Sequence, residues 1–131
     1  MICLFFDRNV GTSVPRALRQ LKIPVAIRQH EGTFLKEMPD DQWLADIGRR
    51  GWFVVGHDHM LHRRANELQA IRQHNIGVFY LWGANATRWE KMLTFARAYH
   101  RIIQAANDTP RPFVYRVHQN GRLTRLQIPQ R

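Results

Sequence analysis

The sequence predicts an α/β fold, with a central, mostly parallel sheet flanked by helices and a C-terminal β-hairpin. Short apolar runs bounded by turn-forming residues alternate with longer amphipathic segments, the pattern of strands separated by helices. The tail instead alternates apolar and polar residues around Asn-Gly at 120 and 121, which is typical of a hairpin. A chain of 131 residues with 44% hydrophobic content suffices for one core. We expect a single domain over 1–131, with an α/β core over about 1–106 and the hairpin over 112–128.

The first part of the chain predicts a β-α-β unit followed by a helix and a third strand. The expected strands are 2–6, 24–29 and 52–55, and the expected helices are 13–21 and 40–50. Ser13 is a preferred N-cap residue two positions before Pro15, so we expect it to cap the first helix. The second helix begins with two aspartates and ends with two arginines, as the helix dipole favours.

The remainder predicts a helix over 60–74, a strand over 78–82 and a long helix over about 87–106. The long helix places Trp89 and other apolar residues along one face. Because the tryptophans all lie in apolar patterns, we expect them in the core instead of at a surface that stacks bases. They are Trp43, Trp52, Trp82 and Trp89.

The charge of the chain is strongly positive and unevenly distributed. The net charge is +10, and 17 of the 20 basic residues are arginine, whose planar guanidinium matches phosphate. Residues 1–58 carry +1 and residues 59–131 carry +9. These side chains could simply form polar faces, or bind an acidic protein, but RNA binding is the better interpretation because phosphate contacts supply most sequence-independent affinity. The expected RNA-binding residues are Arg63, Arg64, Arg88, Arg116 and Arg122.

The sequence favours a soluble, cytoplasmic protein. No apolar run reaches the 18 or more residues of a membrane span, and Asp7 and Arg8 interrupt the apolar N-terminus before it could act as a signal peptide. We therefore expect no membrane partner. The single cysteine, Cys3, is expected to be a small core residue.

Acidic residues follow the predicted strands at positions that should meet. Asp7 comes directly after the first strand and Asp58 after the third, so both should lie at the carboxyl edge of a parallel sheet, where α/β proteins bind ligands. Asp40 and Asp41 begin the helix that leads into the third strand. Carboxylates converging from separate segments can hold Mg²⁺ or Mn²⁺. The alternatives are a strand-end solubilising role for Asp7 and simple helix capping for Asp40 or Asp41.

A second type of metal site is suggested by histidines around Asp58. His57, His59 and His62 could bind a transition metal such as Zn²⁺ together with Asp58. Neither an HxxxH motif nor paired cysteines support this alternative.

Three stretches resemble the PIN domain, specifically the branch related to VapC-type ribonuclease toxins. They are FFDRNV, PDDQWLADIGRRGW and VVGHDHMLHRRANELQAI, and the resemblance covers about residues 2–82. It implies that Asp7, Asp40 and Asp58 are the catalytic acids and that Asp41 assists in metal binding. Asn9 and Glu67 would be supporting residues. Many PIN domains carry a further acid shortly after the third, where this chain has Met60.

The resemblance implies an Mg²⁺- or Mn²⁺-dependent endoribonuclease, the toxin of a type II toxin-antitoxin pair. In such an enzyme one or two metal ions activate a water for phosphodiester hydrolysis. The implied partners are RNA and an antitoxin protein, and formation of a homodimer is compatible with the resemblance. Because Met60 leaves the acids one short, the alternative is a PIN-like RNA- or protein-binding module with little or no catalysis.

Overall fold

The computed structural model describes the backbone of residues 1–58 and 61–128, and their side chains apart from those of 61–64. The elements alternate as the sequence predicts. In chain order they are β1 (Cys3–Phe6), the 3-10 helix η1 (Arg8–Val10), α1 (Ser13–Leu21), β2 (Ala26–Gln29), α2 (Asp40–Arg50), β3 (Phe53–Gly56), α3 (Leu61–His74), β4 (Gly77–Leu81), α4 (Arg88–Asp108), β5 (Phe113–Val117) and β6 (Leu123–Leu126).

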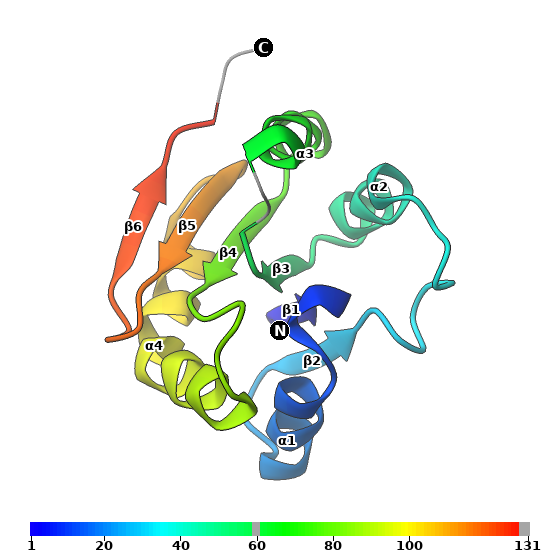
Figure 1. Cartoon of the computed structure of the whole chain (residues 1–131). Coiled ribbons are helices and arrows are strands. Elements are labelled where there is room, and N and C mark those ends of the chain that lie inside the picture. Colours follow the sequence, from blue (N-terminus) through cyan, green and yellow to red (C-terminus); the bar gives the residue numbers. More distant parts are fainter. Residues whose placement is uncertain (59–60, 129–131) are drawn as a thin grey trace.

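The strands of the described residues form one sheet in the order β2-β1-β3-β4-β5-β6 (Figure 1). Neighbours from β2 to β5 pair in parallel, and β6 pairs antiparallel with β5. The C-terminal hairpin therefore continues the sheet, because its first strand lies parallel to β4. This confirms the predicted α/β class with a mostly parallel sheet.

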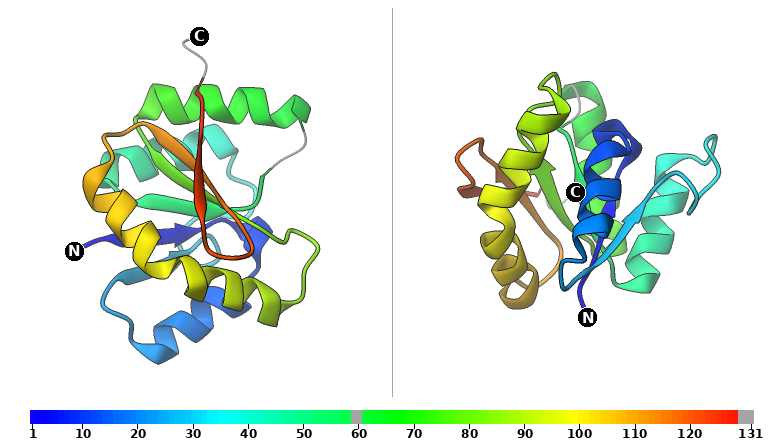
Figure 2. Two further views of the ribbon diagram at one scale, coloured as in Figure 1. Left: turned by 90° about the vertical axis from the view of Figure 1, so that its left-hand side faces the viewer. Right: turned by 90° about the horizontal axis from the view of Figure 1, so that it is seen from below.

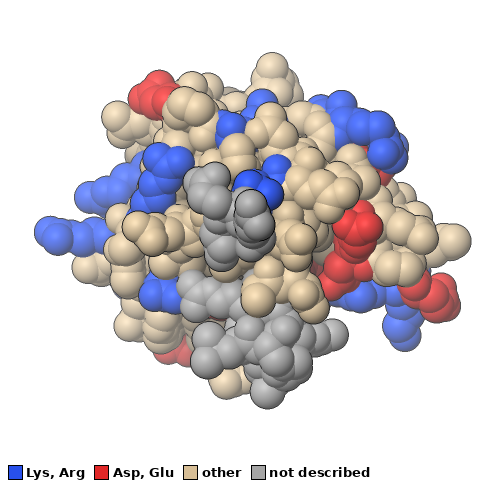
Figure 3. All heavy atoms as spheres, turned by 90° about the horizontal axis from the view of Figure 1, so that it is seen from above, with Lys and Arg blue, Asp and Glu red and all other residues tan. Residues whose placement is uncertain are grey.

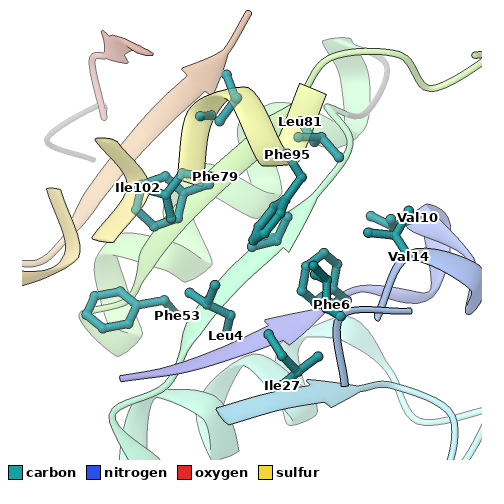
Figure 4. Close-up of a cluster of buried hydrophobic side chains, with 14 of the residues drawn as sticks. Leu4, Phe6, Val10, Val14, Ile27, Phe53, Phe79, Leu81, Phe95 and Ile102 are labelled. Atoms are coloured by element: carbon teal, nitrogen blue, oxygen red, sulfur yellow. The ribbon is translucent and has the colours of Figure 1, made fainter. Parts of the chain in front are cut away.

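Helices cover both faces of the sheet. Figures 1 and 2 show α1 and α4 on one face and α2 and α3 on the other. On the α1/α4 face, Phe6 and Phe95 pack with ring centroids 5.6 Å apart within the larger apolar cluster (Figure 4). On the opposite face a second cluster is built around Trp43 and Phe5. A parallel strand buried on both faces must be apolar throughout, which is why β1, β3 and β4 read as continuous apolar runs.

The element boundaries follow the predictions closely, with one corrected cap. The helices over 13–21 and 40–50 have the predicted bounds, and residue 60 of the predicted helix over 60–74 lies outside the described residues. The N-cap of α1 is Thr12, not Ser13, and Ser13 is already the first helical residue. The Thr12 side chain makes no capping hydrogen bond, so the local sequence preference for serine at the cap does not decide where this helix begins.

Two of the four tryptophans lie outside the core, contrary to the prediction. Trp43 is buried, but Trp82 is 37% exposed and Trp89 is 68% exposed. The buried stripe of α4 runs through Phe95, Ala98 and Ile102, which turns Trp89 away from the sheet. Trp82 directly follows Leu81, the last residue of β4, and so lies outside the strand whose side chains the helices cover.

None of the helices within residues 1–58 and 61–128 combines the length and the apolar composition that crossing a bilayer requires.

Candidate functional site

Asp7 and Asp58 lie at the carboxyl ends of neighbouring central strands. Asp7 follows β1, and its backbone N–H donates to the carbonyl of Val55 in β3 at 2.9 Å. Asp58 follows β3 after one intervening residue. The chain passes from β1 to β2 on one side and later to β3 on the other, so the strand order reverses at β1. A doubly wound sheet has its binding crevice at such a reversal.

Gly56 leaves room for two polar side chains at this edge. A Cβ atom at position 56 would lie 3.3 Å from Cβ of Asp7, 3.6 Å from Asp7 Oδ2 and 3.5 Å from Asn9 Oδ1. The first of these distances is tighter than most real Cβ contacts, and the other two are ordinary van der Waals contacts. The Asp7 side chain is 6% exposed as a result of this close packing against β3. Glycine at the end of β3 therefore lets Asp7 and Asn9 lie directly against the neighbouring strand.

Asn9 joins η1 to the backbone between β3 and Asp58. Its Oδ1 accepts a hydrogen bond from the backbone N–H of His57 at 3.1 Å, and its Nδ2 donates to the carbonyl of His57 at 3.2 Å. The side-chain amide of Asn9 thus forms hydrogen bonds with both the backbone N–H and the backbone carbonyl of His57, the residue before Asp58. The sequence marks Asn9 as a polar position near Asp7, but its partner lies 48 residues away and no local pattern announces the contact.

Arg116 of β5 reaches across the sheet to Asp58. Its Nη2 lies 3.4 Å from Asp58 Oδ2, and both side chains are partly exposed. Side chains alternate between the faces along a strand, and Val114 of β5 belongs to the α2/α3 cluster. Arg116, two residues later, therefore lies on the same face, which places Asp58 there too. Arg116, a predicted RNA contact, pairs in this structure with a predicted catalytic acid.

Asp40 and Asp41 have partners other than Asp7 and Asp58. Asp40 Oδ1 accepts from Trp43 Nε1 at 3.0 Å and lies 3.4 Å from Arg8 Nη2. Asp41 Oδ1 lies 3.0 Å from His74 Nε2 on α3. Both aspartates line a cavity of about 520 Å³ between α2 and α3, together with Glu67.

Glu67, the other predicted supporting acid, belongs to α3. It accepts a hydrogen bond from the Tyr80 hydroxyl of β4. This contact ties Glu67 to the face of the sheet beneath α3.

The predicted metal-binding acids do not form one close group among the residues that the structure describes. Within the described part of the chain, no three His, Cys, Asp or Glu side chains gather closely enough to hold a metal ion. The reason is visible at Asp40 and Asp41, whose carboxylates turn toward Trp43, Arg8 and His74. Asp7 and Asp58 remain at the strand ends. Mg²⁺ commonly uses one or two carboxylates and completes its shell with water and substrate phosphate, so the ligand chemistry of Asp7 and Asp58 suits such an ion.

His57 is a buried residue of the site. Its Nδ1 lies 2.8 Å from the carbonyl oxygen of Leu81, a contact in which the ring nitrogen must donate, and its Nε2 has no hydrogen-bond partner among the described residues. Burial lowers the pKa of His57 below its usual value, and the positive charge of Lys91 lowers this pKa further. The hydrogen bond to Leu81 acts on the pKa in the opposite direction but does not outweigh burial. The imidazole is therefore held neutral.

The rest of the predicted histidine cluster cannot be placed. His59 and Met60 lie outside the described residues, as do the side chains of His62, Arg63 and Arg64.

Basic side chains lie in several places on the face that bears α2 and α3. Figure 3 shows the described Lys and Arg residues of that face in separate groups, with Asp and Glu gathered mainly on one side. Of the predicted RNA-binding residues, Arg88 at the start of α4 and Arg122 in the hairpin are exposed. Both remain accessible to a phosphate backbone.

Comparison with known proteins identifies the family of the chain. Residues 3–83, more than half of the sequence, match the family described as a PIN like domain. Searches of the curated proteins and of the solved structures gave no match. The matched segment runs from β1 to the residues after β4 and so contains Asp7, Asn9 and Asp58. The chain therefore belongs to the PIN-like domain family.

Proposed function

We propose that the protein is a metal-dependent endoribonuclease. The observation that carries the proposal is that Asp7 and Asp58 follow the neighbouring strands β1 and β3 at the reversal point of the sheet, where the Asp7 side chain lies against Gly56. The PIN-like fold is generally a nuclease fold, and acids at the carboxyl ends of strands are suited to phosphodiester chemistry. The net charge of +10 supports a polyanionic substrate.

Asp7 and Asp58 would hold one Mg²⁺ or Mn²⁺ ion. When bound, the ion would supply Lewis acidity, lowering the pKa of a bound water and stabilising charge on the leaving oxygen. Asn9 fixes the His57 backbone and so limits where Asp58 can lie. The hydrogen bond from Arg116 orients the Asp58 carboxylate. Asp40 and Asp41 would bind the ion only after releasing their present partners.

The RNA would be held by cations around the edge. Arg88 and Lys91 lie in the first turns of α4, which follows the loop after β4 and Trp82. Their positive charges can pair with backbone phosphates without reading the base sequence. Arg63, Arg64 and Arg122 would extend this surface. Phosphate contacts of this kind position the strand and leave sequence preference to other groups.

A regulatory partner follows from the same proposal. A ribonuclease in the cytoplasm must be restrained, and we propose that it is the toxin of a type II pair held by an antitoxin. An acidic antitoxin segment would complement the +9 charge of residues 59–131. A homodimer is compatible with this arrangement.

A second candidate is a PIN-like binding module without catalysis. The observation that favours it is the engagement of Asp40 and Asp41 by Arg8, Trp43 and His74, which leaves the acid set small. In this case the chain would bind RNA or protein through the same charged surface but would not hydrolyse the phosphodiester bond.

Cleavage of single-stranded RNA labelled at both ends tests the proposal directly. The wild type is assayed with Mg²⁺, with Mn²⁺ and with a chelator, beside Asp7→Asn and Asp58→Asn. Each substitution should lower the rate about 100-fold or more, equivalent to losing about 3 kcal/mol of transition-state stabilisation. Asp108→Asn is the matched control, because Asp108 is an exposed acid at the end of α4. RNA binding without metal-dependent cleavage by the wild type would favour the binding module.

A further inference from the structure

A second cavity opens beside the acidic edge. It has a volume of about 480 Å³ and lies between η1 and the loop that follows β2. Phe6 and Arg8, the two chain neighbours of Asp7, both line it. The volume is within the range of small-molecule sites, and the lining includes both chain neighbours of Asp7 but not Asp7 itself.

Aromatic and aliphatic side chains form one wall of this cavity. Phe34 lines it and packs edge-on against Phe5, with ring centroids 5.5 Å apart, and also against Trp43. Leu35, the next residue, lines the cavity while remaining 73% exposed. The partly buried Phe34 ring and the exposed Leu35 side chain together give this wall an apolar surface.

A buried polar residue adds hydrogen-bonding capacity to the wall. His30 is 3% exposed and lines the cavity, and its Nε2 has no hydrogen-bond partner among the described residues. Its backbone N–H donates to the carbonyl of Phe6 at 3.1 Å, which fixes its position. Burial lowers the pKa of His30, and the nearby positive charge of Arg8 lowers this pKa further. The negative charge of Asp40 raises this pKa by a smaller amount. A neutral imidazole has one donor and one acceptor, a set suited to the polar edge of a base.

Positive charge lines the same cavity. Arg8 and Lys36 both contribute to the lining, and the Arg8 guanidinium donates to the carbonyl of Lys36 and to Asp40. Glu31, the acid in the lining, is paired with Arg16 at 3.1 Å. An apolar peptide side chain would gain little from these cations, whereas the phosphate attached to a base would pair with them.

We propose that this cavity holds one nucleobase of a single-stranded RNA, beside the bond that is cut at the Asp7 edge. The inference rests on the proposed ribonuclease function and deepens it. Phe34 and Leu35 would contact the face of the base, His30 its polar edge, and Arg8 and Lys36 the adjoining phosphates. Because the phosphates at the edge carry no base identity, this cavity would determine which nucleotide neighbours the cut.

Nucleotide binding to the wild-type protein tests the inference without requiring cleavage. Two-dimensional NMR with AMP, GMP, CMP and UMP should show at least one nucleotide shifting the backbone amides of Gly32, Leu35 and Lys36. Leu35→Ala should weaken that binding about three- to tenfold. Leu21→Ala is the matched control, because Leu21 is a similarly exposed leucine, 68%, on α1 and outside the cavity lining. Neither exposed leucine is needed for the core.

Cleavage mapping supplies the second readout. An RNA containing all dinucleotide steps should show a base preference that Leu35→Ala broadens and Leu21→Ala leaves unchanged. The inference is overturned if no nucleotide shifts the cavity amides, or if both leucine variants lose binding equally. Nucleotide binding at the cavity in a protein that cleaves no RNA would uphold the base site and refute the ribonuclease proposal. RNA cleavage by a protein whose cavity amides no nucleotide shifts would uphold the ribonuclease proposal and refute the base site.

Discussion

Replacing Asn9 with alanine would remove both hydrogen bonds that join η1 to the backbone of His57. The alanine leaves the backbone N–H and carbonyl of a buried residue without their amide partner. An unsatisfied buried group costs about 1 to 3 kcal/mol, and the partial exposure of this contact allows water to compensate for some of it. We therefore expect Asn9→Ala to lower the free energy of unfolding by about 1 to 3 kcal/mol.

Urea denaturation of the wild type, Asn9→Ala and Asn85→Ala measures this loss. Asn85 is an exposed asparagine in the loop between β4 and α4, so its substitution controls for removing an amide from the surface. The midpoint should fall for Asn9→Ala with an unchanged slope, because the amount of surface exposed on unfolding is the same. If Asn9→Ala is no less stable than Asn85→Ala, then the two contacts do not hold the end of β3, and the structural basis for positioning Asp58 fails.

Three further results are expected. Gly77→Ala should lower the free energy of unfolding in urea by about 1 to 3 kcal/mol, because a Cβ there would overlap the Phe113 ring. A midpoint equal to that of the wild type would mean that the ring moves aside freely. His57 has a lowered pKa in the folded state, so the unfolded chain takes up a proton at this histidine at a higher pH than the folded protein does. The contribution of His57 to the free energy of unfolding is therefore complete above the ordinary histidine pKa of about 6.5 and is lost as the pH falls below it. His57→Gln should flatten that acid-side decline in urea midpoints, and an unaltered decline would assign it to other groups. Finally, the logarithm of the affinity for single-stranded RNA should fall with the logarithm of salt concentration by about 0.7 per phosphate contact, and a flat response would argue against RNA.

The order of helices and strands could be predicted because each element carries its own local signal. The helix over 40–50 begins at two aspartates and ends where Gly51 adopts a φ of 71°, a conformation that glycine adopts without strain. The apolar runs of β1, β3 and β4 are what a parallel sheet covered on both faces requires. These features depend on residues close together in the chain.

The partners of the site residues depend on residues far apart, and the sequence did not reveal them. Asp40 lies 32 residues from Arg8, which binds its carboxylate, and Asp41 lies 33 residues from His74. The pattern at residues 40 and 41 suits helix capping and metal binding equally well, so only the folded chain distinguishes them. The exposure of Trp89 was missed for a related reason, because helical periodicity locates an apolar face only to within about a residue.

The position of β1 between β2 and β3 also sets the order in which the edge can be completed during synthesis. Asp7 and Asn9 leave the ribosome before β2, which follows within about twenty residues, yet the backbone that Asn9 binds belongs to residue 57. A contact separated by 48 residues forms only after the two intervening helices, α1 and α2, and the strands β2 and β3 have emerged, since loop closure must precede it. A nascent chain that ends before β3 therefore has one acid of the pair and none of the scaffold that orients the other. Both acids of the pair are therefore present once β3 has emerged, when β1, β2 and β3 of the six-stranded sheet are available to hold them.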